Sequence, residues 1–264
     1  LSIINSPRHG VRIESANNTL SGIFASNNLG SGFAILGGRT NTLDGIVSGI
    51  SSAISTTCAG NGASGVLMGL DASQNVIRNS TLVCNSIAGV TLSTATTVSN
   101  TIGPDNYIGV NAGGTALANV DGVVIEDFAS GNSVNSNTIR SNSATGVKLW
   151  TDARNNAVTA NVIQGNGAFG VALESGSFNN AIESNTIAEN ASYGIRIDGG
   201  TTHSNSISGN LIGIVAAPGF TLAGNGLSGI FMTGRTHHNA FSNNTIAANN
   251  GHGIVVSDSY TNTF

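Results

Sequence analysis

The amino-acid sequence predicts an all-β solenoid in which short parallel strands wind into successive coils. The segment from Val134 to Ile197 contains three lines that superimpose residue for residue, with first positions at Val134, Val158 and Ile182. Asn recurs two residues before each first position, and Gly followed by apolar-x-apolar recurs later in each line. A fixed repeat of 24 residues is typical of a solenoid.

The Gly-led segments are expected to be strands. Their apolar-x-apolar pattern has the period of two that places two side chains inside and one outside, and no segment keeps a period of 3.6. Strands one coil apart run in the same direction, so the sheets are predicted to be parallel, with a rise of about 4.8 Å per coil. The segments begin at Gly10, Gly32, Gly65, Gly89, Gly122, Gly146, Gly170, Gly194, Gly229 and Gly253. The sequence therefore predicts about ten coils.

Asparagine columns are the second regular feature. Identical amides one coil apart can form hydrogen bonds along the stack, and Asn tolerates the left-handed conformation of a tight turn. The first ladder includes Asn132, Asn156, Asn180 and Asn205, and the second includes Asn137, Asn161, Asn185 and Asn210. A third follows Asn85, Asn142, Asn166, Asn190 and Asn249. The glycine at each strand start is expected to allow either a positive φ or a close backbone approach.

Composition excludes several classes of function. Only 8% of residues are charged, against about 25% in ordinary domains, and the 9 Lys and Arg residues are scattered. No nucleic-acid partner is therefore expected, and no apolar run approaches the roughly 18 residues of a membrane span. The Asn-rich, Lys-poor composition suits a secreted or cell-surface protein. We expect one domain, residues 1–264, cut from a longer protein, with flanking domains or further copies meeting its uncapped ends.

Three coils are longer than the rest. Their extra residues precede the Gly-led strand, and the inserts at Ile108–Asn119 and Ile212–Gly224 resemble each other. We expect them to project as loops from one edge of the rod, at coils that do not adjoin. Cys58 and Cys84 lie in successive coils, two positions out of phase. Their spacing leaves open a disulfide or two buried thiols.

The repeat also resembles a known family. The pattern N-x-I-x-x-N-x-x-x-G-[VI]-x-[LI], at Asn137–Leu149, Asn161–Leu173 and Asn185–Ile197, resembles the β-helix repeat of the pectin-lyase-like superfamily. The long coil at Ile108–Val123 resembles a sub-type of large exported bacterial proteins. The resemblance implies a right-handed parallel β-helix. It implies no single activity, because lyases, hydrolases, epimerases, adhesins and phage spikes share that fold.

Coils are numbered here by their strand-start glycines, so coils five to eight are those of Gly122, Gly146, Gly170 and Gly194. Outward positions of the Gly-led strands on these four coils form the strongest candidate site. Carboxyl groups in one column, one coil apart, approach the separation in retaining glycosidases, about 5–5.5 Å. Two such charges should also raise one pKa. The candidate catalytic residues are Glu174, Asp198, Lys148 and Arg196, and the candidate binding residues are Trp150, Glu126, Asp152 and Arg154. The alternative is a solvated charge ladder, with Arg196 and Lys148 neutralising the acids.

The remaining sequence patterns give weaker support for a functional site. Gly251–Gly253 resembles the Gly-His-Gly motif of polygalacturonases, but the paired Asp and the basic segment of that family are missing. His203, His237 and His238 lack a Cys or carboxylate to complete a ligand set, so no metal site is expected. No cofactor is expected either, and a Ca²⁺ among turn oxygens is left open. An apolar outward column could mark contact with another domain; it contains Leu67, Val124, Phe231 and Val255.

From the sequence we favour a non-catalytic exported scaffold that serves as a surface, adhesion or carbohydrate-contacting segment. The alternatives are a polysaccharide lyase or glycosidase that uses a groove on coils five to eight, and a repeat that self-associates into filaments. The expected partners are a polysaccharide or cell-surface glycan.

Overall fold

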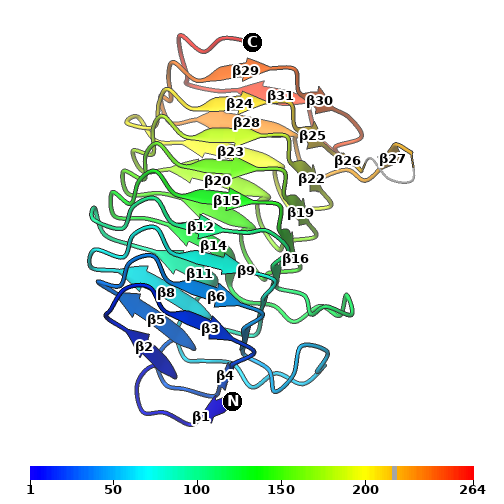
Figure 1. The fold of residues 1–264 in the computed structure, drawn as a ribbon. Helices are drawn as coiled ribbons and strands as arrows, with labels where there is room; N and C mark the ends of the chain where they lie inside the picture. Colours follow the sequence, from blue (N-terminus) through cyan, green and yellow to red (C-terminus); the bar gives the residue numbers. More distant parts are fainter. Residues whose placement is uncertain (216–218) are drawn as a thin grey trace.

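In the computed structural model, which describes residues 1–215 and 219–264, the chain is a right-handed parallel β-helix (Figure 1). Successive coils contribute strands to three parallel sheets, called sheets A, B and C, of ten, ten and nine strands, and the described residues form no helix. The predicted all-β fold class is confirmed.

Sheet A consists of β1 (Ser2–Ile4), β4 (Phe24–Ser26), β7 (Val47–Ser48), β10 (Thr81–Leu82), β13 (Tyr107–Ile108), β16 (Thr138–Arg140), β19 (Val162–Gln164), β22 (Thr186–Ala188), β25 (Leu211–Ile212) and β30 (Thr245–Ile246). Sheet B contains the Gly-led strands β2 (Val11–Ile13), β5 (Phe33–Leu36), β8 (Val66–Gly69), β11 (Ala88–Leu92), β14 (Asp121–Ile125), β17 (Val147–Leu149), β20 (Val171–Glu174), β23 (Ile195–Asp198), β28 (Ile230–Thr233) and β31 (Ile254–Val256). Sheet C consists of β3 (Thr19–Ser21), β6 (Thr42–Asp44), β9 (Val76–Arg78), β12 (Thr101–Ile102), β15 (Ser133–Asn135), β18 (Ala157–Thr159), β21 (Ala181–Glu183), β24 (Ser206–Ser208) and β29 (Ala240–Ser242).

The core consists of aliphatic columns that run along the rod. Val147 pairs with Val171 and Val171 with Ile195, so each inward side chain lies over its equivalent in the next coil. All three are fully buried. Because every coil repeats this register, the three sheets surround one continuous apolar core.

Three asparagine ladders run through the corners of the coils. The Asn156 amide donates to Ala129 O (3.0 Å) and Asn180 Oδ1 (3.2 Å). Its Oδ1 accepts from the backbone N–H and the side-chain amide of Asn132, at 2.9 and 3.1 Å. Both polar atoms of this buried side chain are therefore satisfied without water.

The expectation that the ladder asparagine itself takes the left-handed conformation is wrong. That conformation belongs to the residue before it, as at Asn155 (φ 55°), Ala160 (φ 55°) and Ser141 (φ 57°). The preceding residue makes the bend and points outward, which turns the next side chain into the corner. Asn is required there for its amide, and not for its tolerance of a positive φ.

The glycines at the starts of the sheet B strands allow close packing. A Cβ added to Gly146 would lie 2.5 Å from Ile163 Cγ2, 2.7 Å from Gly170 O and 2.9 Å from Asn166 Nδ2. Gly146 does not have a positive φ. Of the two reasons considered for these glycines, close approach is therefore the one that applies.

The long coils project as loops from the edge that follows sheet A (Figure 1). In the third, β26 (Ile214–Val215) pairs antiparallel with β27 (Thr221–Leu222), and residues 216–218 of this predicted insert lie outside the described residues. The loop of the first long coil contains Ser55, and the loop of the second contains Asn111. These two loops touch although their coils do not adjoin, because Asn111 Nδ2 donates to Ser55 O at 3.0 Å. They fold over the coil between them, above an apolar cluster of Val47, Ile50, Val83 and Leu117.

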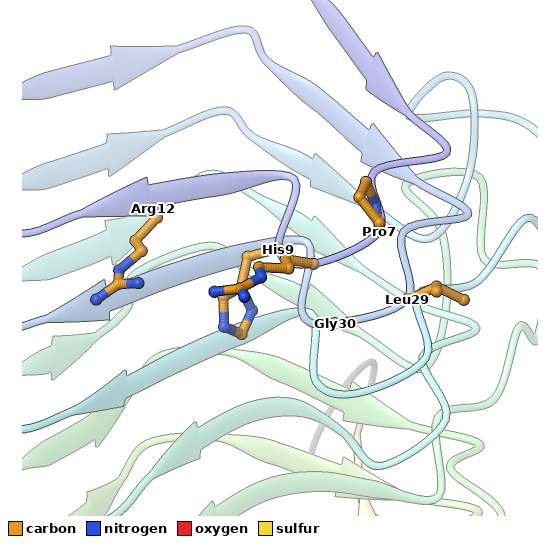
Figure 2. Close-up of a pocket in the computed structure, with 6 residues that line it drawn as sticks. Pro7, His9, Arg12, Leu29 and Gly30 are labelled. Atoms are coloured by element: carbon orange, nitrogen blue, oxygen red, sulfur yellow. The ribbon is translucent and has the colours of Figure 1, made fainter.

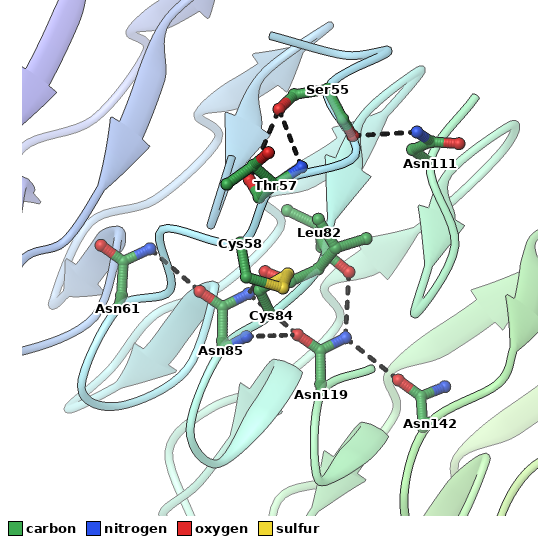
Figure 3. Close-up of a disulfide and its surroundings, with 11 residues drawn as sticks. Ser55, Thr57, Cys58, Asn61, Leu82, Cys84, Asn85, Asn111, Asn119 and Asn142 are labelled. Atoms are coloured by element: carbon green, nitrogen blue, oxygen red, sulfur yellow. Dashed lines mark hydrogen bonds between the residues drawn. A yellow bond between two sulfur atoms is a disulfide. The ribbon is translucent and has the colours of Figure 1, made fainter. Parts of the chain in front are cut away.

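Cys58 and Cys84 form a disulfide beneath these loops (Figure 3). Cys84 precedes Asn85 of the third ladder, whose amide donates to Asn119 Oδ1 at 3.0 Å. The bond therefore ties the first loop to the asparagine ladder of the next coil.

Candidate functional site

The outer face of sheet B presents two columns of side chains on β14, β17, β20 and β23. In the first, Val124, Lys148, Ala172 and Arg196 lie in register. In the second, Glu174 lies directly opposite Asp198. The structure thus places these sequence candidates on adjacent coils of one sheet.

Arg196 joins the two acids. Its Nη1 donates to Glu174 Oε1 and its Nη2 donates to Asp198 Oδ2. Both carboxylates act as acceptors toward one guanidinium, and all three side chains are partly buried. A strong charge-assisted network of this kind holds ionised side chains in place.

A stack of rings flanks this cluster. The Arg196 guanidinium lies 5.2 Å from the centre of the Phe169 ring. Phe169 stacks on Tyr193 with ring centres 6.0 Å apart, and Tyr193 stacks on Phe231 at 4.5 Å. These rings come from three successive coils, and sequence reasoning gave them no role. The signal was present, because Phe169 and Tyr193 occupy the same position one repeat apart, immediately before the strand-start glycine.

Trp150, the only tryptophan in the chain, is fixed by two contacts. Its Nε1–H donates to Glu126 Oε2 at 2.7 Å, and Lys148 Nζ lies 4.0 Å from the ring centre. Lys148 therefore contacts the indole and does not take part in the Arg196 cluster. Burial raises the pKa of Glu126, and the hydrogen bond from Trp150 opposes that rise.

Asp121 is a fourth acid on this face that sequence reasoning missed. It accepts the backbone N–H of Thr145 at 2.8 Å, and burial raises the pKa of its carboxyl, opposed by that hydrogen bond and by Lys148. The available signal was its position: it comes directly before Gly122, where the next repeats have Thr145, Phe169 and Tyr193.

Asp152 and Arg154 lie in the turn after β17. The Arg154 guanidinium lies 5.6 Å from the centre of the Phe128 ring. The Arg154 backbone forms an isolated parallel β-bridge with Phe178 in the next coil. Asp152 is half-buried, and its backbone N–H donates to Ser175 O at 3.1 Å. Neither side chain contacts Trp150 through a hydrogen bond in the described part of the chain.

The apolar column is only partly exposed. Leu67, Phe231 and Val255 are half-buried, but Val124 is 5% exposed and does not form an open apolar surface. Thr91 and Lys148 flank Val124 in register on the neighbouring strands. A branched side chain between two such neighbours loses contact with water, which corrects the expectation for this position.

The histidines form a stack in the turn between sheets B and C. His203 and His237 have ring centres 5.1 Å apart, and His237 Nδ1 lies 2.7 Å from His238 Nδ1. Partial burial lowers the pKa of His237, and its two neighbours lower it further. Within residues 1–215 and 219–264, no three His, Cys, Asp or Glu side chains have an arrangement that could hold a metal ion.

Comparisons with known proteins support the fold. A family model described as "Right handed beta helix region" matches residues 115–217. The Azotobacter vinelandii mannuronan C-5 epimerase AlgE4 A-module is similar in structure, with a TM-score of 0.61 and 15% identity, over 100% of this chain and 79% of that one. No curated protein sequence matches the chain.

Two further structures share the fold. The periplasmic alginate epimerase AlgG T265N mutant has a TM-score of 0.51 and 13% identity, over 90% of this chain. The Dettilon tailspike protein gp208 has a TM-score of 0.58 and 14% identity, over 97% of this chain. This chain covers 61% and 60% of those two structures, less than two thirds of their length. No helix among the described residues is long and apolar enough to cross a membrane.

Proposed function

We propose that this chain is a non-catalytic exported β-helix that contacts carbohydrate through the outer face of sheet B on coils five to eight. The observation that carries the proposal is the fixed position of Trp150 between Glu126 and Lys148. An indole held at a protein surface offers a rigid apolar face at low entropic cost. Lys148 lies over one face of the ring, and the proposal places a sugar ring against the other.

The Arg196 cluster supports a non-catalytic role. A glycosidase needs one carboxyl as a proton donor and another as a base or nucleophile. Here Glu174 and Asp198 both accept from one guanidinium, so the two carboxyl groups share one environment. The proton donor and the base of a glycosidase need two different environments, which set their pKa values apart. The same charges still allow hydrogen bonds to sugar hydroxyls.

Proteins whose structures share this fold support carbohydrate as the class of ligand. Two of the similar structures are epimerases of mannuronan or alginate and a third is a tailspike. A shared fold does not transfer an activity, so the proposal is restricted to contact with a glycan. The ligand is a polysaccharide or cell-surface glycan.

The proposed location is outside the cytoplasm. The Cys58–Cys84 disulfide is of the kind that persists in oxidising compartments, and one similar structure is a periplasmic enzyme. We further propose that residues 1–264 act as one domain of a longer exported protein.

Affinity electrophoresis through gels with embedded neutral or uronic-acid polysaccharides tests the proposal. At least one glycan should retard the wild-type protein, and Trp150→Ala should remove most of that retardation. Tyr107→Ala is the matched control, because Tyr107 is an exposed aromatic residue on sheet A. Equal retardation of wild type and Trp150→Ala, or no retardation by any glycan, would overturn the proposal.

One observation favours an enzyme as the second candidate. Glu126 and Asp121 have raised pKa values beside Lys148, and a raised carboxyl pKa is what a general acid requires. A lyase or glycosidase would then use these two acids, with the Arg196 cluster in a binding role. Product formation that disappears in Glu126→Gln but persists in Glu183→Gln would favour this candidate.

A further inference from the structure

A pocket of about 400 Å³ lies at the edge of sheet B on the first two coils, several coils away from Trp150. It is lined by Pro7, Arg8, His9, Arg12, Leu29 and Gly30. Figure 2 shows Arg12 on one side of His9 and Pro7 and Leu29 on the other. The pocket thus combines a basic side with an apolar side, and its volume is within the range of about 300–1,000 Å³ typical of small-molecule sites.

Hydrogen bonds fix the turn that forms the basic side. The Ser6 hydroxyl donates to His9 O at 2.9 Å, and the Ser6 N–H donates to Asn28 Oδ1, also at 2.9 Å. His9 Nδ1 accepts the backbone N–H of Ser31 at 3.0 Å, which fixes the ring. The turn is therefore held in place before any ligand arrives, which lowers the entropic cost of binding.

The underlying glycine keeps the turn close to the second coil. A Cβ on Gly30 would lie 2.8 Å from His9 Nδ1 and 2.9 Å from the Arg8 carbonyl carbon. The Gly30 N–H donates to Arg8 O at 2.8 Å. Only glycine allows this packing without moving Arg8 and His9.

The basic groups are incompletely neutralised. Arg12 Nη2 donates to Glu14 Oε1 at 2.6 Å, which uses part of a guanidinium that has five N–H donors. Among the described residues, no carboxylate lies within ion-pair distance of Arg8. Of the two exposed guanidinium groups at this pocket, only that of Arg12 pairs with a carboxylate among the described residues, and that carboxylate is Glu14.

We propose that this pocket binds an oxyanion, a carboxylate, sulfate or phosphate group, between Arg8, His9 and Arg12. Guanidinium groups recognise such anions through paired N–H donors. Pro7 and Leu29 would contact the apolar part of a molecule that bears the anion. The site goes beyond the proposed function, because it does not depend on Trp150 or on coils five to eight.

The pH dependence follows from the groups around His9. The ring faces Arg8 and Arg12 from its own segment, with Glu14 bound to Arg12, and faces the uncharged Gly30 and the Ser31 N–H from the next coil. Burial lowers the pKa of His9, and the two arginines lower it further. A bound anion offsets the arginine charges, so it should raise the pKa of His9, and binding should strengthen as the pH falls.

Nuclear magnetic resonance of the five histidine side chains tests the proposal. Sulfate is the first probe, because it stays doubly charged throughout the titration. Sodium chloride at equal ionic strength is the control, and inorganic phosphate and glucuronate are further arms that distinguish the sources of the anion. The resonances of the 264-residue chain are followed against pH with each probe, in wild type and in Arg8→Gln, Arg12→Gln and Arg39→Gln.

The proposal predicts that sulfate raises the pKa of His9 toward its ordinary value with saturation, while chloride does not. Arg8→Gln and Arg12→Gln should each weaken binding about tenfold, the loss of about one charge-assisted contact. Arg39→Gln removes an exposed arginine elsewhere and should have no effect. The proposal is overturned if all five histidines respond alike, if chloride has the same effect, or if Arg39→Gln weakens binding as much as Arg8→Gln.

Discussion

The inside corners of the rod and the outer face of sheet B are built from the same geometry but differ in one respect. Both are columns of side chains one coil apart. In the corners the residue is the same in each coil, so Asn132, Asn156 and Asn180 satisfy one another through identical bonds. On the outer face the residue changes, and Lys148 is followed by Ala172 and then Arg196.

This difference separates structural positions from candidate binding positions. A column of identical residues is explained by the stacking of the coils alone. Where the residue varies from coil to coil, the stacking of the coils does not require any particular side chain. The contacts of such a column are therefore specific to particular coils: Trp150 with Glu126, and Arg196 with Glu174 and Asp198. The glycan-binding and catalytic candidates on coils five to eight use positions of the second kind.

The largest expected effect is in the corner ladder. Asn156→Ala removes four hydrogen bonds, leaves the buried Asn132 N–H without its acceptor, and interrupts the ladder between Asn132 and Asn180. We expect a loss of about 3 to 5 kcal/mol in the free energy of unfolding, measured in urea. Thr159→Ala, three residues away and half-buried, should cost less than about 1 kcal/mol. Equal costs for the two variants would remove the distinction between the columns.

The disulfide should have the next largest effect. The loop between Cys58 and Cys84 spans 26 residues, and a bond of that span contributes about 3 kcal/mol in the chain-entropy description. In the Cys58→Ser, Cys84→Ser double variant, we expect amide hydrogen exchange to accelerate at 49–60 and 109–118 and to stay unchanged on coils six and seven. A uniform acceleration along the rod would contradict this local role.

The strand-start glycines should have a moderate effect. Gly146→Ala places a methyl group against Ile163 and the backbone of the next coil, so we expect a loss of about 1–3 kcal/mol. Gly69 is the matched control on the same sheet, because an added Cβ would have ordinary contacts at 3.6 Å or more. Similar thermal midpoints for the two variants would show that close packing is not what requires glycine there.

The smallest expected effect is on the outer face. The raised pKa of Glu126 means that the folded chain binds this proton more tightly than the unfolded chain, so its carboxylate opposes folding at neutral pH. That penalty should begin to decrease as the pH falls through the folded-state pKa and should be gone below the unfolded-state pKa. Trp150 fluorescence should report the change through their hydrogen bond, with a midpoint above 4.5, the ordinary value for Glu. The transition should be absent in Glu126→Gln; its persistence there would assign it to another group.

The sequence predicts the repeated parts of the structure well. The columns containing Val147, Val171 and Ile195 follow from a period of two inside a period of 24, which allows one register. The same register predicts which outward residues share a column, including Glu174 and Asp198.

The remaining features depend on contacts that no repeat encodes. The bridging position of Arg196 and the contact of Lys148 with Trp150 are choices among side-chain rotamers of flexible residues. The burial of Val124 depends on its particular neighbours. The contact between the first two loops, and the Arg8 and His9 side of the pocket, involve residues outside the regular frame.

The central claim, glycan contact through Trp150 without cleavage, is tested most directly by following binding and product formation in one sample. The polysaccharide that retards the protein is added while Trp150 fluorescence and new reducing ends or unsaturated products are recorded together. We predict a saturable change in fluorescence and no products after prolonged incubation. Products that accumulate with the wild-type protein and vanish in Glu126→Gln or Arg196→Gln would contradict the claim and assign catalysis to this face.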